Sequence, residues 1–374
     1  MHKSKIFLVG ERGDSLIALE ETGYMTESTL QGLLTKYPDL LPGDQIDPES
    51  PRRWLLVSQE MGVPDGATEG GRWSLDHLFL DQDGIPTFVE CKRATDTRIR
   101  REVVAQMLDY AANGIQYWSI DRLRQSAAES AERRGESLDD EIARLLDEVD
   151  SAFDVEEFWG QVEDNLRSRR VRLVFVADST PKELRRLVEF LNEEMTHVEV
   201  LAVEIKQFQD KDRESQKALV PRVVGLTEMA RSAKKSTSKR RKPLTREQFM
   251  EKLPPQSQVF FQRSLDLAEA RGHVIEWGTI GFSIRAYLPN GRLATFAYGN
   301  VRNEFHVYLG YKNLIPSGEV EQALRSKLSD LNIFKESGKW TLKTSLTKEN
   351  LVGLDEVYDF LLDEVDSILE TKRE

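Results

Sequence analysis

The chain has 374 residues, of which 39% are hydrophobic and 31% charged, a composition typical of a globular protein with two or three domains. Its single cysteine, Cys91, excludes an intramolecular disulfide framework and a zinc site built from several cysteines. The apolar runs are too short for a signal peptide or a membrane span. We therefore expect a cytoplasmic protein with no membrane partner.

The net charge of −12 is unevenly distributed, so it does not exclude a nucleic-acid partner. Residues 129–164 contain fourteen Asp or Glu and three Arg, whereas residues 231–246 contain eight Lys or Arg and no acid. Because screening limits electrostatic reach to about 8 Å at physiological salt, these local charges matter more than their sum. The basic segment lacks apolar periodicity, which predicts a flexible linker that also offers phosphate contacts.

Strands and helices alternate before this linker. We expect a hairpin over residues 5–9 and 15–19, a helix over 26–36, strands over 54–58, 73–81 and 86–92, and a helix over 97–113 that ends at Asn113-Gly114. We then expect an acidic helical insert at about 115–168, a strand over 171–177, a helix over 181–195 and a strand over 197–207. Such an alternation predicts an α/β fold with a mixed or parallel sheet covered on both faces.

The pattern after the linker is different. A helix over 257–271 precedes four short strands between residues 273 and 309, and helices near 318–330 and 350–371 follow. Pro289-Asn290-Gly291 is typical of a hairpin turn. The sequence thus predicts a first domain over residues 1–228, a basic linker over 229–246, and a second, smaller α+β domain over 247–374.

The candidate chemistry lies on two neighbouring strands. Side chains alternate across a strand, so Glu90 and Lys92 share one face while Cys91 points to the other. Asp76 lies on the preceding strand, and a turn at residues 81–84 lets the two strands pair, which would bring Asp76 toward Glu90. Two carboxylates beside a lysine suit Mg²⁺, with Mn²⁺ as an alternative ion. The ion would polarise a phosphoryl oxygen and activate a water that Lys92 orients or deprotonates.

These residues resemble the PD-(D/E)XK nuclease superfamily. Asp76 followed by Glu90-Cys91-Lys92 is similar to its core motif, and Gln106-Met107-Leu108-Asp109-Tyr110 is similar to the Gln-x-x-x-Tyr helix motif of the RecB-like branch. Glu27 lies on an upstream helix similar to the one that often supplies another acid to such sites. The resemblance covers about residues 20–210 and implies a restriction-endonuclease-like mixed central sheet flanked by helices.

The resemblance implies a metal-dependent deoxyribonuclease that hydrolyses phosphodiester bonds, with DNA preferred to RNA, in phage defence, restriction or DNA repair. Asp76 and Glu90 would hold the metal, and Lys92 would assist the attacking water. The residues that would shape the site are Glu27, Gln106 and Tyr110. Four arginines would contact phosphates near the start of the following helix: Arg93, Arg98, Arg100 and Arg101. The C-terminal domain would bind a target, an activating partner or a second copy of the chain.

Two alternatives stay open from the sequence. The first is a catalytically silent protein that binds nucleic acid on a nuclease fold, although all three polar residues of the core motif are present. The second is a regulatory protein whose acidic insert mimics DNA or holds the basic linker. Pro64-Asp65 could also supply the aspartate of the motif, but it lies in a Gly-rich segment outside any expected strand, so we favour Asp76. We expect His77 on the opposite sheet face in a structural role.

Overall fold

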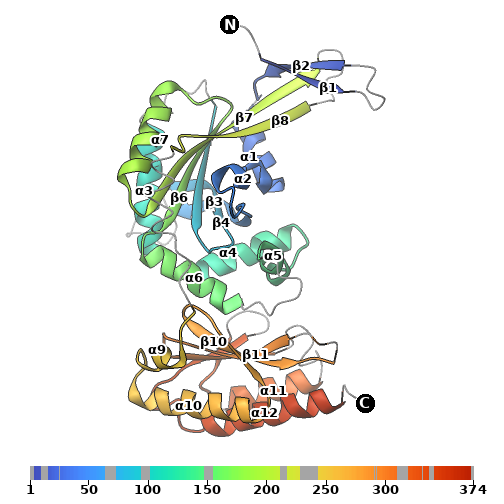
Figure 1. Ribbon diagram of the computed structural model, residues 1–374, viewed down its shortest axis with the longest axis vertical. Coiled ribbons are helices and arrows are strands. Elements are labelled where there is room, and N and C mark those ends of the chain that lie inside the picture. Colours follow the sequence, from blue (N-terminus) through green and yellow to red (C-terminus); the bar gives the residue numbers. More distant parts are fainter. Residues whose placement is uncertain are drawn as a thin grey trace. The chain divides into compact units, whose positions relative to one another are not determined.

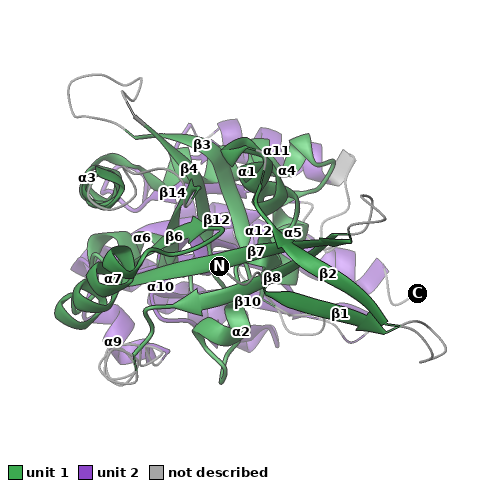
Figure 2. Cartoon of the chain, turned by 90° about the horizontal axis from the view of Figure 1, so that it is seen from above, with its two compact units in different colours: residues 1–146, 161–239 green, residues 147–160, 240–374 purple. Residues whose placement is uncertain are grey.

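The computed structural model describes residues 4–9, 16–24, 26–63, 73–93, 102–146, 155–210, 217–227, 243–289, 291, 293–309, 319–330, 332–336 and 341–371. The chain forms two compact units, one of residues 1–146 and 161–239, the other of residues 147–160 and 240–374 (Figure 2). The first contains a mixed central sheet flanked by helices, and the second contains an antiparallel sheet. The predicted α/β class is thereby confirmed. No helix among the described residues is long and apolar enough to cross a membrane.

The sheet of the first unit has the order β1-β2-β7-β6-β5-β4-β3 (Figure 1). Strands β2 and β6 pair with successive parts of one edge of β7, and β8 pairs with the opposite edge of β7. Its strands are β1 (Lys5–Val9), β2 (Leu16–Thr22), β3 (Leu55–Val63), β4 (Trp73–Leu80), β5 (Pro86–Lys92), β6 (Val171–Ala177), β7 (Val198–Asp210) and β8 (Lys217–Val224). Strands β5, β6 and β7 run parallel, and the other pairs are antiparallel. The carboxyl ends of the neighbouring strands β5 and β6 therefore lie side by side, at the same end of these two strands.

Helices cover both faces of this sheet (Figure 1). On one face lie α1 (Glu27–Lys36), η1 (Pro38–Leu40) and α2 (Gly43–Ile46), and on the other lie α3 (Glu102–Tyr117), α7 (Lys182–Glu194) and residues 161–167 of α6 (Val155–Arg167). The insert also forms α4 (Ile120–Arg133) and α5 (Leu138–Leu145), which contact β3. Residues 155–160 of α6 belong to the second compact unit, and residues 161–167 to the first.

The predicted end of α3 at Asn113-Gly114 was wrong, because the helix continues to Tyr117. Gly114 is buried inside the helix, where an added Cβ would lie 2.7 Å from the Trp118 side chain and 3.1 Å from Phe88. The glycine therefore permits close packing of α3 instead of ending the helix.

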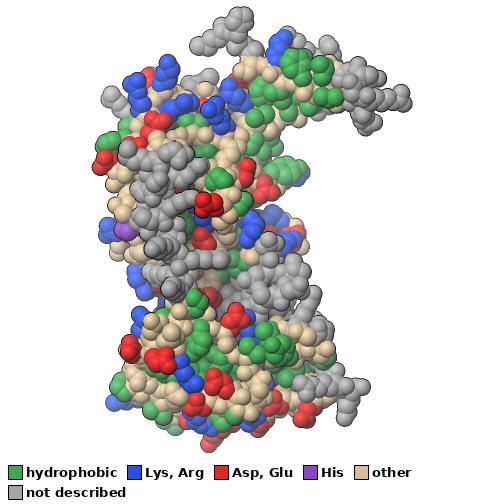
Figure 3. All heavy atoms as spheres, viewed as in Figure 1, with side chains coloured by type: hydrophobic (Ala, Val, Ile, Leu, Met, Phe, Trp, Pro, Cys, Tyr) green, Lys and Arg blue, Asp and Glu red, His purple; other side chains and the backbone are tan. Residues whose placement is uncertain are grey.

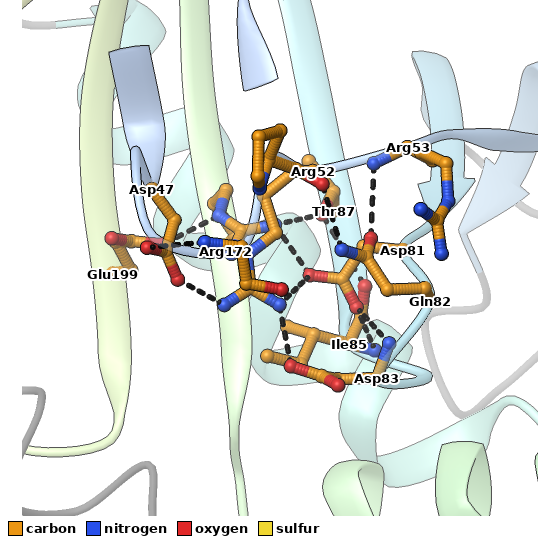
Figure 4. Close-up of polar contacts among 12 residues, drawn as sticks. Asp47, Arg52, Arg53, Asp81, Gln82, Asp83, Ile85, Thr87, Arg172 and Glu199 are labelled. Carbon is orange, nitrogen blue, oxygen red and sulfur yellow. Dashed lines mark hydrogen bonds and ion pairs between the residues drawn. The ribbon is translucent and has the colours of Figure 1, made fainter. Parts of the chain in front are cut away.

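A buried ion network fixes the β4–β5 turn, at the opposite end of β5 from Lys92 (Figure 4). Asp81 Oδ1 accepts hydrogen bonds from the backbone N–H groups of Asp83 at 3.0 Å and Ile85 at 2.9 Å. The same carboxylate pairs with Arg172 Nη1 at 3.0 Å, and Arg172 is only 2% exposed. The network is completed by Asp47, Arg52, Thr87 and Glu199. Because its charges are paired out of water, removing one of them would leave another unbalanced.

The β1–β2 hairpin exposes apolar side chains, which Figure 3 shows at its surface. They are Phe7, Leu8, Val9 and Leu16.

The second unit has an antiparallel sheet in the order β13-β14-β12-β11-β10-β9. Its strands are β9 (Val274–Trp277), β10 (Gly281–Tyr287), β11 (Leu293–Asn300), β12 (Glu304–Tyr308), β13 (Lys335–Glu336) and β14 (Thr341–Ser345). Its helices are α9 (Arg246–Met250), α10 (Pro255–Ala270), α11 (Glu319–Asp330) and α12 (Leu354–Thr371), and α10–α12 share one hydrophobic core with the sheet. Most of the predicted basic linker lies outside the described residues.

Candidate active site

Lys92 brings together acidic side chains from three elements at the end of β5. Its Nζ lies 3.0 Å from Glu90 Oε1, 2.9 Å from Glu27 Oε1 and 4.0 Å from Asp76 Oδ2. Four of the predicted site residues thus form one cluster.

Local structure explains how each of these residues reaches the cluster. In the β4–β5 ladder His77 lies opposite Val89, which puts Asp76 opposite Glu90 one position further along. The backbone N–H of Cys91 donates to Asp76 Oδ2 at 2.7 Å. Helix α1 starts at Glu27 because the Thr26 side chain caps it, so Glu27 occupies the first turn.

Burial gives the cluster unusual electrostatics. Burial and the charge of Asp76 raise the pKa of Glu90 to about 7, against the opposing effect of Lys92. Burial also raises the pKa of Asp76, although Lys92 and the Cys91 N–H counteract it. Burial alone would lower the pKa of Lys92, but the charges of Glu90 and Asp76 raise it above its ordinary value. Lys92 is therefore a charged ammonium group, and Glu90 is poised between its protonated and ionised forms at neutral pH.

As they stand, no three His, Cys, Asp or Glu side chains in the described part of the chain are placed to hold a metal ion. Glu90 Oε2, however, is buried and has no hydrogen-bond partner among the described residues. A buried acceptor without a partner is costly, and a cation or a proton would satisfy it. Since Mg²⁺ keeps several waters and prefers oxygen ligands such as carboxylates, Asp76 and Glu90 fit as its ligands.

Helix α3 carries the predicted glutamine–tyrosine pair. Gln106 Nε2 donates a hydrogen bond to the hydroxyl of Tyr110. Burial raises the pKa of Tyr110, and the charges of Glu90 and Asp76 add to that rise. Tyr110 therefore lies within electrostatic reach of the cluster.

The predicted phosphate-binding arginines are described only in part. Arg93 follows β5 and is half-buried, whereas Arg98, Arg100 and Arg101 lie outside the described residues, as does Pro64-Asp65. His77 is buried, with Nε2 2.9 Å from Thr35 Oγ1 on α1. Its burial lowers its pKa to about 4, so the ring is neutral at pH 7.

Two residues near the cluster, Gln31 and Glu60, are not among the predicted site residues. The side chain of Gln31 hydrogen-bonds Asp76, and the charge of Glu60 helps to raise the pKa of Asp76. A signal for Gln31 was present, because it lies one helical turn after Glu27 on the same face. Glu60 gave no signal, because the predicted strand ended at residue 58 whereas β3 extends to Val63.

No protein-family model matches this chain, and the comparisons with curated proteins and with solved structures find no match either. The case for an active site therefore depends on the residues and their geometry alone.

Proposed function

We propose that this chain is a metal-dependent endonuclease of the PD-(D/E)XK, RecB-like kind that hydrolyses phosphodiester bonds of DNA. The observation that carries the proposal is the meeting of Glu27, Asp76 and Glu90 around Lys92. Three carboxylates face one ammonium group, and one buried carboxylate oxygen has no partner in the described part of the chain. Such perturbed, incompletely balanced clusters are typical of functional sites.

The order of the elements also supports the proposal. The motif residues lie on α1, on two adjacent antiparallel strands, β4 and β5, and on α3, and the next strand, β6, runs parallel to β5. This arrangement belongs to a mixed sheet flanked by helices, which is what the resemblance implies (Figure 1).

The side chains would divide the chemistry among them. Asp76 and Glu90 would hold Mg²⁺, which, when bound, supplies Lewis acidity to a phosphoryl oxygen and to a water. Because the pKa of Lys92 is raised, its ammonium would orient the attacking water and offset developing negative charge, and would not act as a base. Glu27 would keep Lys92 in place, and Tyr110 with Gln106 would position the substrate.

A cleavage assay with matched variants tests the proposal. Supercoiled plasmid, single-stranded DNA and RNA would be incubated with Mg²⁺, Mn²⁺ or EDTA and the wild type, Glu90→Gln or Lys92→Met. Lys206→Met and Glu21→Gln are the controls, because these two residues form an ion pair at 3.1 Å elsewhere in the same sheet. We expect metal-dependent DNA cleavage by the wild type and both controls, and a loss of about 100-fold or more in the site variants.

Other outcomes separate the alternatives. Metal binding that disappears in Glu90→Gln, without any cleavage, would favour a silent nucleic-acid-binding protein or an enzyme that needs an activator. If the folded wild type neither cleaves nucleic acid nor binds a metal ion, the catalytic proposal is overturned.

A further inference from the structure

A glutamate with a left-handed backbone lies on the edge strand β3. Glu60 has a backbone φ of 55°, which lies in the left-handed region that residues other than glycine rarely adopt. The other non-glycine residues with positive φ in the described part of the chain are Arg169, Asn303 and Asn332, and all three lie in turns. Glu60 is unlike them because it lies inside a strand.

Two side chains from the α3–α4 region anchor β3 on either side of Glu60. Ser130 Oγ donates to the carbonyl of Val57 at 2.8 Å, and Trp118 Nε1 donates to the carbonyl of Gly62 at 3.1 Å. Strained backbone persists where its surroundings fix it in this way, and such positions cluster at functional sites.

The position of Glu60 is opposite Asp76. In the β3–β4 ladder Gln59 pairs with His77 and Met61 pairs with Leu75, so Glu60 and Asp76 fall between these pairs. Glu60 is exposed, and its charge acts on the carboxyl group of Asp76. It is therefore a further carboxylate on the side of the cluster away from β5.

We propose that Glu60 is a further ligand of the divalent cation, beside Asp76. This inference rests on the proposed metal-dependent function. The observation that supports a cation site independently of Glu60 is Glu90 Oε2, a buried acceptor without a partner among the described residues, in a side chain that is 3% exposed. A glycine at position 60 would adopt the same backbone without strain, whereas the glutamate present there adds a carboxylate at the position opposite Asp76. Since Lys92 neutralises part of the cluster, another carboxylate would strengthen cation binding.

Mn²⁺ titration calorimetry on the full chain tests this assignment. We expect Glu60→Gln and Glu60→Gly to weaken Mn²⁺ binding about tenfold or more, and to do so at high salt as well, where long-range effects are screened. Arg169→Gly is the matched control, because it relieves the same backbone strain at φ 58° and should bind Mn²⁺ like the wild type. In EDTA, both glycine variants should melt at or above the wild-type temperature, which shows that they fold.

The results distinguish this inference from the proposed function. Wild-type binding together with unchanged binding by Glu60→Gln would overturn the role of Glu60 and leave the endonuclease proposal standing. A loss that vanishes at high salt would assign the effect to distant charge and overturn ligation. A folded wild type that binds no Mn²⁺ would overturn both.

Discussion

Lys92 Nζ donates a hydrogen bond to Glu27 Oε1 at 2.9 Å, although the two residues are 65 positions apart in the chain. The contact joins the first turn of α1 to the last residue of β5. Lys92 is held from a second side by Glu90 of its own strand. The ammonium is therefore fixed within the cluster, and its removal should affect both stability and chemistry.

Lys92→Met should destabilise the protein by about 1–3 kcal/mol at pH 8 in EDTA, because the buried Glu90 carboxyl loses its partner and must take up a proton, its pKa being about 7 even with Lys92 present. Adding Glu90→Gln removes this buried acid, so the double variant should be more stable than Lys92→Met alone. Urea unfolding of the wild type, both single variants and the double variant measures the coupling. Strictly additive effects would show that the two side chains do not depend on each other.

Glu90 should make stability depend on pH. Its pKa is raised from 4.5 to about 7, so the folded state binds this proton more tightly than the unfolded state does. The resulting stabilisation is complete below about pH 4.5 and is lost as pH rises through about 7, a change of up to about 3 kcal/mol. In EDTA, Glu90→Gln should therefore gain stability relative to the wild type between about pH 5 and pH 8. A difference that stays flat across this range would contradict the raised pKa.

Much of the candidate site could be predicted because it depends on short-range rules. Strand alternation puts Glu90 and Lys92 on one face, and a short turn returns the chain so that Asp76 meets Glu90. The capping residue Thr26 sets the start of α1 and so the position of Glu27. These features need only the local sequence and one strand pairing.

What could not be predicted depends on tertiary packing. Strand β8 contains Pro221, which argues against a strand in the sequence but is tolerated on an edge strand. The left-handed backbone of Glu60 is fixed by Ser130 and Trp118, which are more than 50 residues away. Gly114 is also a tertiary feature, because its neighbour Phe88 lies on β5.

Gly114→Ala and Gly32→Ala should have opposite effects although both replace a helical glycine. At Gly114 the new Cβ would meet Trp118 at 2.7 Å and Phe88 at 3.1 Å, and we expect a loss of about 1–3 kcal/mol. At Gly32, in α1, nothing lies within 4 Å of the new Cβ, so the better helix propensity of alanine should add about 0.5–1 kcal/mol. Thermal unfolding of both variants checks the pair, and a stabilised Gly114→Ala would contradict the close packing of α3.

Asp81→Asn tests whether the buried ion network supports the fold without taking part in the proposed chemistry. The substitution leaves Arg172, which is 2% exposed, without one of its carboxylate partners and should cost about 3–5 kcal/mol. Glu163→Gln is the control, because its ion pair with Arg167 joins two partly exposed side chains one turn apart on α6 and should contribute about 0.5 kcal/mol or less. Since Asp81 follows β4 at the far end of β5 from Lys92, folded Asp81→Asn should bind Mn²⁺ as tightly as the wild type. Weakened Mn²⁺ binding by the folded variant would show that the network and the cluster are coupled through the two strands that join them.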